Sequence, residues 1–213
     1  MELSAVLITY NAAKHLQRTL KALHEVADEI IIVDSGSQDG TKAIALQFPK
    51  VRWFERPFEG YGQQKNYANS LARGRYILSV DADEELSPEL RQAILQEKGY
   101  WKADAYRMLR VAIYCGAEIR AGDWYPDWKV RLFRRDIGRW SEDPVHERLI
   151  IPKGSKVAAL SGEMWHYTYD TPEENLLRTS KYARLQAEFL YKSGYKRSWD
   201  RGFFRFFNRF VKS

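Results

Sequence analysis

The first hundred residues alternate between short apolar runs and helical patterns. The runs are rich in β-branched residues and cover residues 4–9, 29–33 and 75–80. Between the first two, Leu16, Leu20 and Leu23 recur at the spacing of one helical face, and Asn11 stands where an N-cap is expected. Strands that alternate with helices are typical of an α/β fold, so we predict a Rossmann-like first half with parallel strands and crossover helices.

The pattern changes after about residue 100. Before this point, Ser87-Pro88 opens a helix by placing a cap ahead of a first-turn proline. Beyond it, the chain becomes a series of aromatic-rich strands and loops, densest at residues 124–128. We therefore expect one catalytic domain over residues 1–170, in which residues 1–100 bind a nucleotide-containing donor and residues 101–170 bind the acceptor.

A helical, basic segment is predicted for residues 171–213. The sequence Thr171-Pro172-Glu173-Glu174 has the pattern of a capping box and opens a helix that runs toward Gly194. In the stretch 198–213, four phenylalanines fall on one helical face and three arginines recur every fourth residue. This amphipathic tail fits an anionic membrane surface, although the same rings also fit packing against the domain or a partner chain.

The basic charge is confined to this tail. The formal net charge is +6, but from Lys181 onward there are nine Lys and Arg against two acidic residues. The first 180 residues are close to neutral, so we predict no nucleic-acid partner. Cys115 is the only cysteine, which excludes an intramolecular disulfide framework, and residues 1–11 lack the basic start of a signal peptide. These features predict a cytoplasmic protein that is peripheral on the inner face of the membrane.

Polar residues follow each predicted strand of the first half. They are Thr9-Tyr10-Asn11, Asp34-Ser35-Gly36 and Asp81-Ala82-Asp83. Ligands of open α/β sheets bind at the carboxyl ends of the strands, so all three segments are expected to face one crevice. Two carboxylates one residue apart can bind one hard cation, and we predict that Asp81 and Asp83 hold Mn²⁺ or Mg²⁺ against a diphosphate. A solvated turn is the simpler alternative for this motif taken alone.

Two further residues are candidates for binding the nucleotide. Asp34 lies in a run of turn formers, where its carboxylate can accept a hydrogen bond from the imide N–H of a uracil. Asp39, in the same run, is better suited to capping the next helix. Lys65 follows Gly60-Tyr61-Gly62 in the expected first turn of a helix, where it can reach the nucleotide or a phosphate.

The order and spacing of these motifs resemble glycosyltransferase family 2. The resemblance rests on residues 8–11, 33–41, 60–66 and 80–84. It implies a GT-A fold, which is a mixed sheet with flanking helices, a UDP-sugar donor and inversion at the anomeric carbon. Because the chain lacks the Gln-x-x-Arg-Trp motif of processive synthases, we expect one sugar to be transferred per cycle.

Later segments are similar to the bacterial lipopolysaccharide inner-core β-glucosyltransferases that act on heptose. They are residues 122–127, 130–135, 145–147 and 166–169. This similarity implies a lipid-linked core oligosaccharide as acceptor and glucose as the transferred sugar. Arg131 and Arg134 lie in one of these segments, where they can contact phosphate or an anionic acceptor or remain solvated.

The catalytic base and a third metal ligand are predicted from the later segments. Inversion requires a base for the acceptor hydroxyl, and the resemblance favours an acid within residues 142–147, with Glu147 as first choice and Asp143 as second. In several GT-A enzymes a C-terminal histidine completes the metal shell, and His166 is the best-placed candidate here. Its alternative role is packing between Trp165 and Tyr167.

Two other functions are compatible with parts of the sequence. A metal-dependent nucleotidyltransferase also uses an α/β sheet and paired carboxylates, but it would ordinarily carry a Gly-rich basic loop after the first strand, where this chain has Thr9-Tyr10-Asn11. A noncatalytic module that binds membrane or nucleic acid would account for the basic tail. It would leave the acidic strand ends unexplained.

Overall fold

The structure is a computed structural model and describes residues 1–142, 147–192 and 194. Met1–Asp170 forms one compact unit. Its main sheet contains the strands β1 (Leu3–Thr9), β2 (Glu29–Asp34), β3 (Val51–Glu55), β4 (Tyr76–Ser79), β5 (Glu84–Leu86), β6 (Ala105–Tyr114), β7 (Ala117–Ile119), β8 (Asp127–Arg134) and β11 (Val157–Tyr169). A separate two-stranded sheet pairs β9 (Arg139–Trp140) with β10 (Leu149–Ile150).

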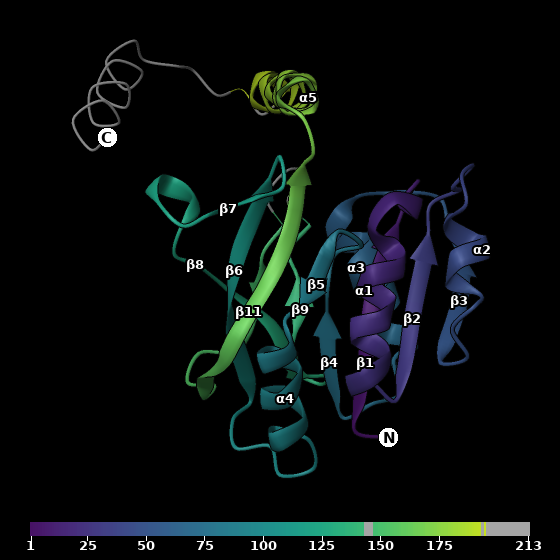
Figure 1. Cartoon of the computed structure of the whole chain (residues 1–213), viewed down its shortest axis with the longest axis vertical. Helices are drawn as coiled ribbons and strands as arrows, with labels where there is room; N and C mark the ends of the chain where they lie inside the picture. The colour runs from purple at the N-terminus through teal and green to yellow at the C-terminus, as the bar shows by residue number, and fades with distance from the viewer. Residues whose placement is uncertain (143–146, 193, 195–213) are drawn as a thin grey trace. The chain divides into compact units, whose positions relative to one another are not determined.

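The main sheet is mixed, as Figure 1 shows. Its strands follow the order β3-β2-β1-β4-β8-β6-β11-β5, with β7 paired to β6. The strands β3, β2, β1 and β4 are parallel to one another, whereas β8 runs antiparallel to both β4 and β6. The strand β11 is parallel to β6 and antiparallel to β5. The predicted α/β class with a mixed sheet is therefore confirmed.

Helices cover both faces of the sheet. They are α1 (Ala13–Val26), α2 (Thr41–Ala45), α3 (Tyr61–Leu71) and α4 (Pro88–Glu97), with a short 3₁₀ turn at Gly122–Trp124. In Figure 1, α1 and α4 lie on the face nearer the viewer and α3 lies behind the sheet. Each face has its own apolar core, and the predicted stripe of Leu16, Leu20 and Leu23 is fully buried in the first. The second core includes Ala68, which belongs to α3, and Ala72, which directly follows this helix.

The three strands predicted in the first half correspond to β1, β2 and β4. The strand β3 was not predicted, because its sequence Val-Arg-Trp-Phe-Glu neither alternates cleanly nor forms an apolar run. It is half-buried at one edge of the sheet, where polar side chains can reach solvent.

The prediction that Asn11 caps α1 is wrong. Asn11 has a φ of 49°, and its side-chain oxygen accepts a hydrogen bond from the backbone of Gln38. The start of α1 is held instead by Asp39 and by Thr41, the first residue of α2: Asp39 accepts from the N–H of Ala13, and Thr41 accepts from the N–H of Ala12, the residue before the helix. Asp39 also accepts from the backbone N–H of Thr41, so this carboxylate joins the starts of α1 and α2.

Two other predicted caps are present. The Ser87 hydroxyl accepts from the backbone N–H of Leu90 at 3.2 Å, directly before Pro88. Thr171 accepts from the N–H of Glu174 at 3.2 Å, at the start of the helix α5 (Pro172–Lys192). The helix α5 belongs to a second compact unit. The amphipathic stretch 198–213 lies outside the described residues, so its proposed membrane contact stays a prediction.

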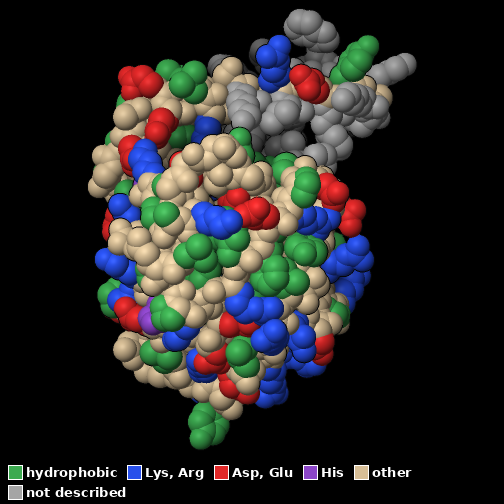
Figure 2. All heavy atoms as spheres, turned by 90° about the vertical axis from the view of Figure 1, so that its right-hand side faces the viewer, with side chains coloured by type: hydrophobic (Ala, Val, Ile, Leu, Met, Phe, Trp, Pro, Cys, Tyr) green, Lys and Arg blue, Asp and Glu red, His purple; other side chains and the backbone are tan. Residues whose placement is uncertain are grey.

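Charge on the main unit is mixed. On the α2 and β3 side of the sheet, Figure 2 shows Lys and Arg side chains among Asp and Glu side chains. Among the helices of the described residues, none combines the length and the apolar character needed to cross a bilayer.

Replacing Gly162 with alanine should destabilise the main unit severely. Gly162 has a φ of 85°, and an added Cβ would lie 2.2 Å from the backbone nitrogen of Leu90. Backbone strain and overpacking together predict a loss of about 3 kcal/mol or more in the free energy of unfolding. Gly154 is the matched control, since it has a φ of 88° but no atom within 4 Å of the added Cβ. Urea denaturation should separate the two variants, and equal losses would contradict the close packing of β11 on α4.

Candidate active site

The carboxyl ends of β1 and β2 lie side by side. Thr9 is opposite Asp34 in the parallel register, and its hydroxyl donates to Asp34 Oδ1 at 2.7 Å. Both residues are buried. The predicted convergence of these strand ends is therefore present, and it is held by a hydrogen bond between the two predicted site residues.

The carboxylate of Asp34 is saturated by Thr9 and by the loop that follows β2. Oδ1 accepts from the hydroxyls of Thr9 and Ser37, and Oδ2 accepts from the backbone N–H groups of Gly36 and Ser37. A carboxylate has about four acceptor positions, so these contacts use all of them. Binding of a uracil imide by Asp34 would require Ser37 or Thr9 to give up a contact.

Tyr10 and Asn11 extend beyond the end of β1. Tyr10 is 65% exposed, which leaves its ring available to a ligand. Asn11 holds the loop after β2 in place, because its backbone N–H donates to the Ser37 hydroxyl and its side chain accepts from Gln38. Tyr10 is thus available for a nucleotide contact, while Asn11 shapes the crevice.

Asp81 follows β4 and lies between two cations. Its Oδ1 is 2.9 Å from Lys65 Nζ, and its Oδ2 is 2.7 Å from Arg131 Nη2. Burial by itself raises the pKa of Asp81, but Arg131 and then Lys65 outweigh it and hold the pKa well below its usual range. Asp81 is therefore a carboxylate at neutral pH whose charge is already balanced by protein groups.

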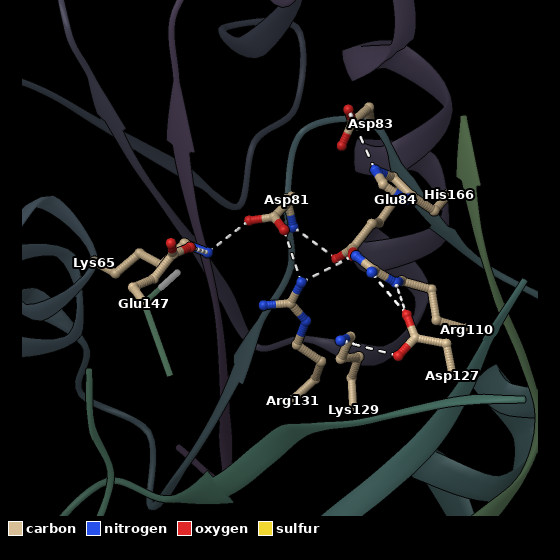
Figure 3. A network of polar contacts seen from close by, with 10 residues as sticks. All are labelled: Lys65, Asp81, Asp83, Glu84, Arg110, Asp127, Lys129, Arg131, Glu147 and His166. Atoms are coloured by element: carbon tan, nitrogen blue, oxygen red, sulfur yellow. Dashed lines mark hydrogen bonds and ion pairs between the residues drawn. The ribbon is translucent and has the colours of Figure 1, made fainter. Parts of the chain in front are cut away.

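A second carboxylate, Glu84, fixes the turn that carries Asp81. Glu84 is fully buried, and its Oε2 accepts from the backbone N–H of Asp81 at 2.9 Å. Its Oε1 accepts from Arg131 at 2.9 Å and from Arg110 at 3.2 Å. Arg110 also forms an ion pair with Asp127. Figure 3 shows these side chains as one connected polar network.

Replacing Glu84 with glutamine should weaken both the fold and the site. The change removes the buried negative charge shared by Arg110 and Arg131, so we expect a loss of about 3 kcal/mol in the free energy of unfolding. The KM for the donor should also rise, because the turn at Asp81 loses its anchor. Urea denaturation and initial rates would measure both effects. Glu89→Gln, at an exposed position on α4, is the control, and unchanged stability of both variants would contradict the role of Glu84.

Lys65 joins Asp81 to the predicted base. Its ammonium group is 2.9 Å from Glu147 Oε1 and lies 4.5 Å from the centre of the Trp140 ring. The sequence predicted Lys65 in the first turn of a helix. Because α3 begins at Tyr61, Lys65 lies in the second turn instead. It is buried between carboxylates. Asp143, the second candidate for the base, lies outside the described residues.

Asp83 points away from Asp81 and toward His166. Asp83 Oδ2 is 3.7 Å from His166 Nε2, and Figure 3 shows the two side chains facing each other. The sheet creates this proximity, because His166 on β11 is opposite Glu84 on β5, and Tyr167 N–H donates to the Asp83 carbonyl at 2.9 Å. Ala82, between the two aspartates, accepts from the Thr19 hydroxyl through its carbonyl at 3.0 Å.

The donor set of Asp83 and His166 fits a divalent transition metal. Carboxylate oxygen suits Mg²⁺ and Mn²⁺, while imidazole suits transition metals, so the pair as a whole favours Mn²⁺. Within the described ranges there is no group of three or more His, Cys, Asp or Glu side chains arranged around one ion. A bound ion would therefore take its remaining ligands from the donor diphosphate and water, as open catalytic sites do.

The sequence did not predict that Arg131 and Arg110 hold the buried carboxylates of the site. Arg131 was predicted to contact substrate or solvent, but it is buried and bound to Asp81 and Glu84. Burial lowers the pKa of Arg131, yet Asp81 and Glu84 outweigh that effect and raise it above its usual value. Arg134 instead binds Asp104 and Asp136 at the other end of β8. The ladder between β6 and β8 has a register shift at Arg131, so alternation along the strand gave no signal for the direction of this side chain.

His15 is a further residue near the site that was not predicted. His15 lies in the first turn of α1, and its ring stacks on Tyr167 with the ring centroids 5.4 Å apart. Burial lowers the pKa of His15, and Asp170 only partly opposes this. His15 is therefore neutral at pH 7 and packs beside the strand end that carries His166.

Comparison with known proteins agrees with the geometry. Residues 4–149 match the family model described as Glycosyl transferase family 2. Over 205 residues the chain is 31% identical to the lipopolysaccharide core biosynthesis glycosyltransferase LpsC of Rhizobium meliloti, covering 91% of this chain and 73% of LpsC.

Two solved structures share the fold at low sequence identity. The structure of GalNAc-T7 with UDP, GalNAc and Mn²⁺ has a TM-score of 0.56 at 16% identity and covers 79% of this chain and 44% of that chain. S. aureus TarS 1-349 in complex with UDP-GlcNAc has a TM-score of 0.50 at 19% identity and covers 75% of this chain and 58% of that chain. The chain thus spans about half of each of these proteins, and the similarity to them shows the fold.

Proposed function

The chain belongs to glycosyltransferase family 2, and from this premise we propose that it transfers one glucose from a UDP-sugar to a heptose of a lipopolysaccharide core. The observation that carries the proposal is the arrangement of acidic side chains beyond the end of β4. Lys65 bridges Asp81 and Glu147, Arg131 binds Asp81, and Asp83 faces His166. Family membership leaves the nucleotidyltransferase and the noncatalytic module without support.

The donor would bind across the ends of these strands. Tyr10 offers an exposed ring for the base, while Thr9, Asn11 and Asp34 shape the surrounding loop. Lys65 and Arg131 balance the charge of Asp81, which limits repulsion between this carboxylate and an incoming diphosphate. The two structural neighbours bind UDP or a UDP-sugar, which supports a uridine donor.

Asp83 and His166 would hold a Mn²⁺ or Mg²⁺ ion beside the diphosphate. When bound, the ion supplies positive charge that stabilises the departing UDP. The register of β11 against β5 keeps His166 next to the Asp83 turn, so the two ligand atoms stay close before the donor arrives. The GalNAc-T7 structure contains Mn²⁺, which supports this assignment.

Glu147 would act as the catalytic base. Its carboxylate takes the proton from the acceptor hydroxyl as that oxygen bonds to the anomeric carbon and the bond from this carbon to UDP breaks. Attack from the face opposite the leaving group inverts the anomeric centre. The ion pair with Lys65 holds the carboxylate of Glu147 on the side of the ammonium group that Asp81 does not occupy.

The acceptor assignment rests on LpsC. That relative is named for lipopolysaccharide core biosynthesis, and its alignment continues through the second half of this chain. A lipid-linked core saccharide is therefore the acceptor class we propose. Contact of residues 198–213 with an anionic membrane would bring the enzyme to such an acceptor.

A donor and acceptor screen tests the proposal. The full chain is incubated with Mn²⁺, Mg²⁺ or EDTA, a panel of UDP-sugars, and heptose-containing core oligosaccharides. We expect UDP release and a product heavier by one hexose, both dependent on the metal. Product with an unrelated acceptor would revise the acceptor alone, whereas no transfer from any nucleotide sugar would contradict the whole proposal.

A further inference from the structure

Trp140 is a buried aromatic residue that lies outside both apolar cores. Its side chain is 4% exposed, yet among the described residues it belongs to neither of the two clusters that pack on the faces of the sheet. Two buried cations lie against it instead. Lys65 Nζ is 4.5 Å and the guanidinium carbon of Arg131 is 5.7 Å from the centre of the ring. Both distances are within the roughly 6 Å over which an aromatic ring attracts a cation.

Apolar packing alone does not explain a tryptophan at this position. The indole nitrogen Nε1 of Trp140 is buried and forms no hydrogen bond with any described residue. A buried N–H group without a partner costs free energy, and a leucine or a phenylalanine would avoid that cost. Tryptophan, however, has the ring face that attracts cations most strongly. The side chain at position 140 therefore suits the binding of cations better than it suits a purely apolar contact.

The helix α3 holds Trp140 through two consecutive residues. Lys65 places its ammonium group over the ring, and Asn66 binds the backbone of the same tryptophan. Trp140 N–H donates to Asn66 Oδ1, and Asn66 Nδ2 donates to the Trp140 carbonyl, both at 2.9 Å. One turn earlier, a Cβ added at Gly62 would lie 1.9 Å from the carbonyl oxygen of Ser141, so the chain at the end of β9 packs directly on the helix. The ring is thus fixed to α3 by contacts other than its contact with the cations.

The two cations beside the ring hold acidic side chains of the candidate active site. Lys65 Nζ is 2.9 Å from both Asp81 Oδ1 and Glu147 Oε1, and Arg131 Nη2 is 2.7 Å from Asp81 Oδ2. Figure 3 shows Lys65 and Arg131 approaching Asp81 from different sides. A shift of either cation would therefore disturb Asp81, and a shift of Lys65 would also release Glu147.

We propose that Trp140 is a positioning residue for the transfer reaction and acts through Lys65 and Arg131. Its ring stabilises both cations in a place that little water reaches, and the cations in turn keep Asp81 and Glu147 in position before the substrates bind. This role rests on the proposed function, because the positions of these carboxylates affect the rate only if the carboxylates serve the reaction.

Fluorinated tryptophans placed at position 140 alone test the role of the ring. Each fluorine on the benzo ring weakens the attraction for a cation and leaves the shape of the side chain almost unchanged, so a residue needed only for packing would show no trend. We expect kcat/KM for the donor to fall stepwise with one, two and three fluorines, by about tenfold in all. The same series at Trp53, whose ring lies 5.9 Å from Lys42 Nζ and outside the site, should leave kcat/KM unchanged.

Substitutions and unfolding measurements extend the test. Trp140→Leu should lower kcat/KM about tenfold, whereas Trp140→Phe, which keeps a ring, should lower it about threefold or less. The midpoint of urea denaturation should also fall along the fluorinated series, and this fall should be smaller in Lys65→Met, where the nearer cation is absent. Unfolding requires no activity, and the fluorinated series keeps the test valid if Trp140→Leu does not fold.

A flat or rising kcat/KM along the fluorinated series at position 140 would overturn the proposal. The same would follow from a urea midpoint that depends on fluorine equally with and without the Lys65 ammonium group. If the unsubstituted protein transfers sugar normally and the series is flat, the proposed function stands and Trp140 is a packing residue. Absence of transfer by the unsubstituted protein would instead refute the proposed function and this role with it.

Discussion

Asp83→Asn is expected to abolish metal-dependent transfer while the protein remains folded. Asp83 contributes one of the two side-chain atoms that face each other across the proposed metal site, with His166 Nε2 3.7 Å away. An amide in this position keeps the shape but removes the charge that binds a hard cation. We expect kcat/KM to fall by about three orders of magnitude or more, which is the scale of a lost electrostatic group in a transition state.

Two measurements and a control variant separate this effect from misfolding. Binding of Mn²⁺ in the presence of UDP, followed by electron paramagnetic resonance, should weaken at least tenfold, and the thermal melt should stay within a few degrees of the wild type. Asp136→Asn is the control, because Asp136 is an exposed carboxylate paired with Arg134 outside the site. Full activity of Asp83→Asn, or equal activity of the wild type in EDTA, would refute the metal assignment.

Glu147→Gln should lower kcat by about a hundredfold or more with little change in the KM for the donor. Glutamine preserves the size of the side chain, but it cannot accept the acceptor proton, and general bases contribute a factor of this size. The donor KM should hold because Lys65 keeps its second carboxylate partner, Asp81. Initial rates at saturating acceptor, together with the titration of UDP binding, measure the two quantities separately.

The neighbouring acids provide the controls for this prediction. Glu142→Gln removes an exposed acid of the same segment, one that pairs with Arg139, and should leave kcat within about twofold. If Asp143→Asn reproduces the loss and Glu147→Gln does not, the base is Asp143. A loss of donor binding in Glu147→Gln would instead make Glu147 a positioning partner of Lys65.

The strands and helices of the first half could be predicted because their signals are local. The apolar runs that became β1, β2 and β4 and the leucine stripe of α1 are visible within windows of a few residues. The Asp81–Asp83 turn could likewise be placed at a strand end. Asn11 shows the limit of this approach, since Asp39 and Thr41, distant in sequence, satisfy the start of α1 in its place.

The partners of the acidic residues could not be predicted in the same way. Whether Lys65 and Arg131 meet solvent, phosphate or Asp81 depends on how α3 and β8 pack against β4, and this packing is nonlocal. His166 was placed near the metal site only through a resemblance. The position of His166 beside Asp83 is caused by the antiparallel register between β11 and β5, which brings together residues about eighty positions apart in the sequence.

The position of β11 within the sheet has a consequence for the order of events during synthesis. In the described part of the chain, β5 pairs only with β11, and β11 is inserted between β5 and β6. A nascent chain that has emerged only through α4 therefore carries β5 without a partner, with its backbone N–H and C=O groups open to other extended segments. Translation delivers the N-terminal elements first, and closure must wait until residues 157–169 leave the ribosome. Since β11 also carries His166, the proposed metal site cannot assemble before β5 has gained its strand partner.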